Sequence, residues 1–193
     1  MITDINNMIS SFCKISGLGM KTAKRVVFSI LNNSDKLSSF IEIVTDIQKT
    51  IFRCSLCGNL NTQKICDICL SDKRSDKILC VVENSEDLYL IENYHFFTGK
   101  YFVLGGLLPE LEKNNLLNSQ FDTLKNLCLN RCVEEVVIAL NFNLDGRLTS
   151  FQIREYLSDL NIKISNLATG IPIGGELNYI DEGTLKAAFE ERK

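Results

Sequence analysis

Four cysteines within 16 residues constrain this chain more than any other feature of its sequence. They form two C-x-x-C pairs, Cys54 with Cys57 and Cys66 with Cys69, and eight residues separate the pairs. Each C-x-x-C turn brings two thiolates together, and two such turns supply the four sulfur ligands that Zn²⁺ prefers in structural sites. A segment this short has little room for an apolar core, so metal binding must provide its folding free energy. The sequence therefore predicts one structural zinc ion per chain in a four-cysteine finger over residues 54–75.

A pair of disulfides and a redox dithiol are the alternative interpretations of these cysteines. The opening residues, MITDINNMIS, have neither the basic flank nor the apolar core of a signal peptide, so we expect a reducing, cytoplasmic location that disfavours disulfides. A redox site normally has a single C-x-x-C beside a βαβ unit. Four thiolates leave no open metal position, which argues against catalytic zinc. No apolar run approaches membrane-spanning length.

Residues 1–53 have the apolar spacing of three helices. Ile5, Met8, Ile9 and Phe12 recur at helical intervals, and a glycine-containing break then precedes a second helix. The apolar face of this second helix consists of Ala23, Val26, Val27, Ile30 and Leu31. A third helix is expected to begin near residue 34 or 35, with its phase marked by Leu37, Phe40, Ile41, Val44 and Ile47.

The join between the first two helices combines two glycines with basic side chains. Gly17 and Gly19 bracket a turn that enters a helix, where free backbone N–H groups lie at the positive end of the helix dipole and can receive a phosphate. Lys21, Lys24 and Arg25 place positive charge one turn further on, where the next phosphate would lie. The pattern predicts a helix-hairpin-helix module that binds the DNA backbone; a tight turn with a solvated basic face is the structural alternative.

The distribution of charge supports a localised nucleic-acid contact. Between residues 5 and 34 there is no acidic side chain, and with Lys14 the basic residues give this stretch a charge of +4. Because the whole chain carries −3, the remainder carries −7. A basic patch on an acidic body favours one electrostatic footprint over indiscriminate binding.

The order of these motifs resembles the RecR family of bacterial recombination mediators. The segment from Ile15 to Arg25, ISGLGMKTAKR, precedes the C-x2-C-x8-C-x2-C finger, and the likeness continues through an α/β region and a glycine-rich tail over nearly the whole chain. Ser16 and Met20 stand where the family usually has proline, whereas both glycines, Lys21 and Arg25 are kept.

Residues 76–168 alternate between apolar runs and helical patterns, which predicts a mostly parallel sheet in a mixed α/β fold. The expected strands cover residues 78–82, 101–104, 136–140 and 162–167, and the expected helices cover residues 85–94, 122–129 and a segment around 153–160. The remaining cysteines, Cys13, Cys80, Cys128 and Cys132, lie in apolar contexts and are expected in the core.

Carboxylates follow two of these strands. Glu83 and Asp145 lie at strand ends, where functional groups of parallel sheets gather, and two carboxylates there can hold Mg²⁺ against a phosphate. The pattern is similar to the Toprim fold of topoisomerases and primases. Arg147 stands where the RecR family usually has the second acid, which removes one metal ligand and suggests an ion pair with Asp145 or Glu83, or a phosphate contact. Helix capping and turn formation are the structural alternatives for the two acids.

The tail over residues 169–193 resembles the closing segment of the RecR family, with Gly170, Pro172, Gly174 and Gly175 in its turn. No phosphate-loop lysine accompanies these glycines, so a structural turn or subunit contact is favoured, before a final helix from residue 181 or 182.

The resemblance implies a non-enzymatic mediator of recombinational DNA repair that works with RecO, and sometimes RecF, to help RecA load onto single-stranded DNA. It also implies a dimeric or tetrameric ring that can encircle DNA. A Toprim-type nuclease or primase-like enzyme is the second hypothesis, and a zinc-stabilised interaction module without DNA contact is the third.

Overall fold

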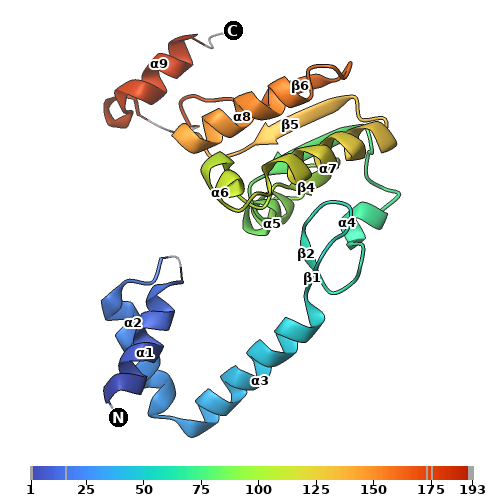
Figure 1. Cartoon of the computed structure of the whole chain (residues 1–193). Coiled ribbons are helices and arrows are strands. Elements are labelled where there is room, and N and C mark those ends of the chain that lie inside the picture. Colours follow the sequence, from blue (N-terminus) through green and yellow to red (C-terminus); the bar gives the residue numbers. More distant parts are fainter. Residues whose placement is uncertain (1, 16, 173, 175, 191–193) are drawn as a thin grey trace. The chain divides into compact units, whose positions relative to one another are not determined.

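The structure is a computed structural model of the whole chain, and it describes residues 2–15, 17–172, 174 and 176–190. The chain divides into two compact units, Met1–Ile51 and Phe52–Lys193. The first unit is helical and the second is a mixed α/β body with the four-cysteine segment at its start (Figure 1). No helix in the described ranges is long and apolar enough to cross a membrane.

The helical unit contains α1 (Ile2–Cys13), α2 (Met20–Leu31) and α3 (Ser34–Thr50). Its small core joins Ile9 of α1 to Ala23 and Val27 of α2. The three predicted helices are confirmed, but the apolar face of α2 is narrower than its sequence suggests. Val26 and Ile30 are only half-buried, and Leu31 is 40% exposed.

Helix α3 has an apolar face that stays exposed. Its side chains follow the predicted phase, yet those that the sequence marks as apolar are about half open to solvent: Phe40, Ile41, Ile43, Val44 and Ile47. Isolated exposed apolar residues are ordinary, whereas a continuous apolar face on one helix indicates a contact surface.

The second unit opens with the finger. Strands β1 (Phe52–Arg53) and β2 (Leu60–Asn61) pair antiparallel around the first C-x-x-C turn. The short helix α4 (Asp67–Leu70) carries the last cysteine of the second turn. The finger has so few apolar residues that the four cysteines are the centre of its buried cluster.

The predicted parallel sheet is confirmed. Strands β3 (Ile78–Val82), β4 (Lys100–Val103), β5 (Glu135–Ala139) and β6 (Lys163–Asn166) lie in the order β4-β3-β5-β6, and every neighbouring pair is parallel. Strand β3 is buried almost throughout because it has a neighbour on each side and packs on both faces. That explains its continuous apolar sequence.

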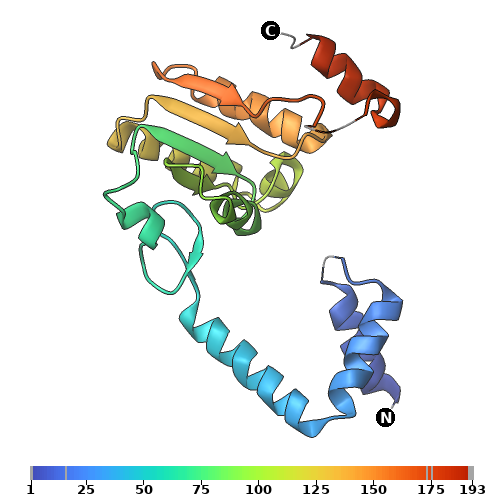
Figure 2. The ribbon, with the colours of Figure 1, turned by 180° about the vertical axis from the view of Figure 1, so that it is seen from behind.

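Helices cover the sheet unequally. Helix α5 (Ser85–Asn93) packs on the face that contains Cys80 and Val82. Helices α6 (Leu108–Lys113), α7 (Leu117–Asn130) and α8 (Leu144–Tyr156) pack on the face that contains Leu79 and Val81. Seen from behind, strands β3, β5 and β6 lie in front of α7 and α8 (Figure 2). The larger core therefore belongs to the α6–α8 side.

The sequence pattern did not predict α6, and it misplaced one cysteine. Cys80 and Cys128 are buried as predicted, and Cys13 is half-buried against the small core of the helical unit. Cys132 is exposed, with a φ of 51°. The prediction for Cys132 was wrong because this residue turns the chain out of α7 into the loop before β5. Near the C-terminus, a 3₁₀ turn (Leu177–Tyr179) precedes α9 (Glu182–Glu190), whose first turn is capped by Asp181 accepting from the Thr184 amide. Gly175 of the predicted turn lies outside the described residues.

We expect Gly58→Ala to destabilise the second unit more than Gly105→Ala. Both glycines have a positive φ, of 76° and 86°, so alanine costs backbone energy of about 1–2 kcal/mol at either position. A Cβ at Gly58 would lie 2.8 Å from the Val103 carbonyl oxygen, whereas one at Gly105 meets nothing within 4 Å. Overpacking should therefore add about 1–3 kcal/mol at Gly58 alone. Urea unfolding followed by circular dichroism measures both, and equal losses would show that the finger can leave β4 without cost.

Candidate metal centre and nucleic-acid interface

The four cysteines converge on one point. All four sulfur atoms lie within 4.8 Å of one another, and all four residues are buried. The Sγ atoms of Cys54 and Cys69 are 3.9 Å apart, and those of Cys57 and Cys66 are 3.6 Å apart. Sulfurs around a tetrahedral ion with bonds of about 2.3 Å are about 3.8 Å apart, whereas disulfide sulfurs are about 2.05 Å apart. The set therefore fits a metal ion and contains no disulfide.

The four thiols are coupled by hydrogen bonds. Hydrogen bonds from Cys57 and Cys69 lower the pKa of Cys66. The pKa of Cys57 is raised, first by its hydrogen bond to Cys66, then by that to Cys69 and by burial. A divalent cation bound here would displace those shared protons, because thiols must be deprotonated to act as metal ligands.

Backbone hydrogen bonds shape the loops that carry the sulfurs. The Cys54 amide donates to the Asn59 carbonyl at 2.7 Å, and the Gly58 amide donates to the Cys54 carbonyl at 2.9 Å. Gly58 adopts a φ of 76°, which glycine tolerates because it has no Cβ. The Cys66 amide also donates to the Cys54 sulfur at 3.3 Å, which joins the two loops.

The finger is bonded directly to the edge of the sheet. The Val103 amide of β4 donates to the Cys57 carbonyl at 2.7 Å, and Lys100 donates from Nζ to the Cys69 carbonyl at 3.0 Å. Lys100 is 5% exposed and forms an ion pair with Asp76 at 2.9 Å. The same Asp76 carboxylate binds Arg131. Hydrogen bonding from Lys100, together with the nearby charge of Arg131, lowers the pKa of Asp76.

Sequence reasoning missed this attachment. Lys100 and Arg131 both donate to the Cys69 carbonyl, although they lie 31 and 62 residues away from it in the chain. The only local signal was a lysine at the start of an otherwise apolar strand. That position requires a buried partner, because lysine is almost never fully buried unless it is paired.

The glycine turn of the helical unit is built as predicted, but its two glycines differ. Gly17 has a φ of 80°, which other residues adopt with strain, and the Leu18 amide closes the turn on the Ile15 carbonyl at 3.2 Å. Gly19 is the N-cap of α2, with an extended φ of −71° and no side-chain cap. A Cβ at either glycine would meet nothing within 4 Å, so the approach to the start of α2 is open.

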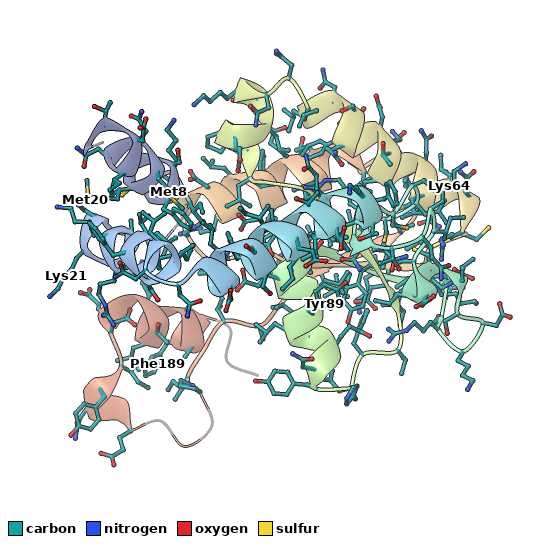
Figure 3. All side chains as sticks on the ribbon, turned by 90° about the horizontal axis from the view of Figure 1, so that it is seen from below. Met8, Met20, Lys21, Lys64, Tyr89 and Phe189 are labelled. Carbon is teal, nitrogen blue, oxygen red and sulfur yellow. The ribbon has the colours of Figure 1, made fainter. Side chains whose placement is uncertain are left out.

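The basic side chains face solvent beside that turn. Lys21, Lys24 and Arg25 are exposed, while Ala23 and Val27 on the other side of α2 are buried. Lys21 extends outward from the first turn of α2 (Figure 3). Helix α2 therefore presents its free N–H groups and three cations together, which is an arrangement that receives phosphate oxygens.

The two predicted acidic residues occupy different settings. Glu83 follows β3 directly and accepts a hydrogen bond from the Asn141 side chain at 3.0 Å. Asp145 lies in the first turn of α8, whose N-cap Asn143 accepts from the Gly146 amide at 2.8 Å. The helix expected around residues 153–160 begins earlier in the structure, at Leu144, because Asn143 caps its first turn.

Arg147 does not form the expected ion pair. Within the part of the chain that the structure describes, no salt bridge joins it to Asp145 or Glu83, and its guanidinium lies over the Phe142 ring, 5.6 Å from the centroid. A cation held over an aromatic ring stays available to an anion. Over the described residues, only the four cysteines bring three or more metal-binding side chains together.

Comparison with known proteins gives the family. The sequence model of the Toprim domain matches residues 77–168, and the model described as "RecR, C-terminal" matches residues 170–193. Recombination protein RecR of Rickettsia bellii is 41% identical over 191 residues, which cover 98% of this chain and 96% of the relative. The RecR proteins of Rickettsia felis (41%, 95% of the relative) and Orientia tsutsugamushi (39%, 94%) match over the same share of this chain. The chain therefore belongs to the RecR family of recombination proteins.

Proposed function

We propose that this chain is a non-enzymatic, DNA-binding mediator of recombinational repair in the cytoplasm. It assists the loading of RecA onto single-stranded DNA together with RecO and, in some settings, RecF. The observation that carries the proposal is the open N-terminus of α2 beside Lys21, Lys24 and Arg25 in a chain of the RecR family. Membership in the family supports the recombination role, and the geometry of α2 supports the contact with DNA.

The contact is with the phosphate backbone and is independent of base sequence. Backbone amides and solvated cations recognise phosphate oxygens, which are the same at every nucleotide. Gly17 and Gly19 keep the approach open, and the buried side of α2 fixes the direction in which the cations point. The single- and double-stranded forms of DNA both satisfy this chemistry.

The chain works as a homo-oligomer, a dimer or a tetramer that forms a ring. Support comes from the apolar face of α3, where Ile41 and Ile43 are each 55% exposed and Ile47 is 52% exposed. A second copy that covers this face would remove the apolar surface from water. Several weak phosphate contacts in one ring then act together on one DNA molecule.

The four-cysteine site holds one zinc ion per chain. Four thiolates at tetrahedral spacing favour zinc among the common protein metals, and they leave no position for a substrate. The role is structural: Cys57 and Cys69 carry the carbonyls through which the finger joins the sheet.

Zinc content tests this assignment. The wild-type protein, prepared under reducing conditions, should contain one zinc per chain by elemental analysis, and Cys66→Ser should lose most of it together with solubility. Cys132→Ser is the matched control, because Cys132 is exposed and lies outside the cluster. Wild-type protein that folds without metal would exclude the assignment.

DNA binding tests the role of α2. The double variant Lys21→Ala, Arg25→Ala should bind every DNA sequence more weakly, and its log–log salt slope should flatten by about 0.7–0.9 per lost phosphate contact. Its stability should change by less than about 0.5 kcal/mol, since both side chains are exposed. Fluorescence anisotropy at several salt concentrations measures the affinity for DNA and its salt slope.

Lys73→Ala, Lys113→Ala is the control for that pair, because it removes the same charge from exposed positions elsewhere. The control should retain most of the affinity and the full slope. If the double variant in α2 binds like wild type, the glycine turn is only a structural turn and DNA binds elsewhere.

The second hypothesis, a Toprim-type nuclease or primase-like enzyme, predicts metal-dependent DNA cleavage that requires the acidic residues, whereas a non-enzymatic mediator leaves DNA intact. We expect the wild type, Glu83→Ala and Asp145→Ala all to leave DNA intact with Mg²⁺ or Mn²⁺, because Arg147 removes one carboxylate from the set. Any effect of the two variants should appear in binding a basic partner such as RecO. Cleavage by the wild type that both variants abolish would favour the enzyme.

A further inference from the structure

A hollow of about 540 Å³ lies beside the carboxyl ends of β5 and β6, and its lining includes none of the four cysteines. Helix α8 forms one wall, and the segment after β6 forms another. The volume falls within the range of about 300–1,000 Å³ that small ligands occupy. Carboxyl ends of parallel strands are also where α/β folds bind their ligands.

The charge of the hollow is positive. Among the described residues, its charged lining consists of Arg147 and Arg154, on a chain whose net charge is −3. They lie seven residues apart on α8, two turns along the same face. Arg154 donates from Nη1 to the Ile164 carbonyl at 3.1 Å, which fixes that guanidinium against β6. No salt bridge neutralises either arginine within the described residues, so the hollow suits an anion.

Two phenylalanines add flat apolar surface next to those cations. Phe142 is 62% exposed and Phe151 is 60% exposed, and both line the hollow. Exposed rings beside arginines form a surface on which a base can stack while its phosphate meets a guanidinium. Asn141, Ser150 and Asn166 supply polar groups to the same lining.

We propose that this hollow binds one unpaired nucleotide of single-stranded DNA. Phe142 and Phe151 stack on the base, and Arg147 and Arg154 bind its phosphate. Bases in a duplex are already stacked on their neighbours, so the site selects single strands, whereas the α2 contact accepts both forms. The proposal rests on the proposed function, which supplies single-stranded DNA as the source of the nucleotide. The same four side chains also fit a free nucleotide.

Binding of the full chain to single-stranded and duplex DNA separates the two sites. Phe142→Ala, Phe151→Ala should lower the affinity for oligo(dT) by about ten-fold for one stacked base and leave duplex affinity within two-fold. Phe96→Ala is the matched control, because this ring is 68% exposed and lies outside the hollow. Arg147→Ala should flatten the salt slope for oligo(dT), while Lys113→Ala should not. A double phenylalanine variant that binds oligo(dT) as tightly as the wild type overturns the proposal.

Photo-crosslinking locates the base directly. Full-length protein irradiated with an oligonucleotide that contains 5-iododeoxyuridine should yield a crosslink on the peptide with Phe142 or Phe151, and the crosslink should persist in the Phe96→Ala variant. A crosslink confined to residues outside the hollow contradicts the stacking arrangement.

A titration with thymidine monophosphate distinguishes failure of this site from failure of the proposed function. If the wild type binds no DNA but the nucleotide shifts amide signals around the hollow by NMR, the site stands with a free nucleotide as its ligand. If the wild type binds neither DNA nor the nucleotide at the hollow, the site is wrong. A Lys21→Ala, Arg25→Ala variant that binds duplex DNA more weakly, while its nucleotide titration at the hollow matches the wild type, supports two independent sites.

Discussion

Four sulfur atoms within 4.8 Å of one another are the constraint on which the finger and one edge of the sheet depend. Four thiolates this close repel each other unless a cation lies among them. The carbonyl oxygens of Cys57 and Cys69 accept hydrogen bonds from two residues of β4, Val103 and the buried Lys100. A cation bound by the four sulfurs would therefore also fix the carbonyl acceptors that cover the open edge of the sheet.

The carboxyl ends of β5 and β6 carry positive charge. The guanidinium of Arg147 lies there over the Phe142 ring, and within the described residues no ion pair joins it to Asp145. With Arg154 in the same lining, this end of the sheet suits an anion better than a metal ion. The match to the Toprim domain therefore identifies the fold, while the chemistry at the ends of its strands depends on the side chains that stand there.

Sequence patterns predicted the elements whose signal is local. The buried run from Ile78 to Val82 and the cysteine spacing each need only neighbouring residues. Helix α6 was missed because six residues with a proline near the start carry too little periodicity. Tertiary structure determines the hydrogen bond from Lys100 to the Cys69 carbonyl and the position of Arg147 over Phe142. Secondary-structure propensities do not predict such contacts.

The backbone geometry distinguishes the roles of the two glycines before α2. Gly17 is required by its backbone, because a φ of 80° strains any residue with a Cβ. Gly19 has no such requirement: its φ of −71° suits any residue, and a Cβ there would meet nothing. Serine or asparagine at this N-cap would hydrogen-bond the first free amides of α2. Glycine makes no side-chain cap hydrogen bond, so it leaves those amides open to an outside acceptor. Gly19 looks replaceable on steric grounds, yet it is the residue that keeps the start of α2 uncapped.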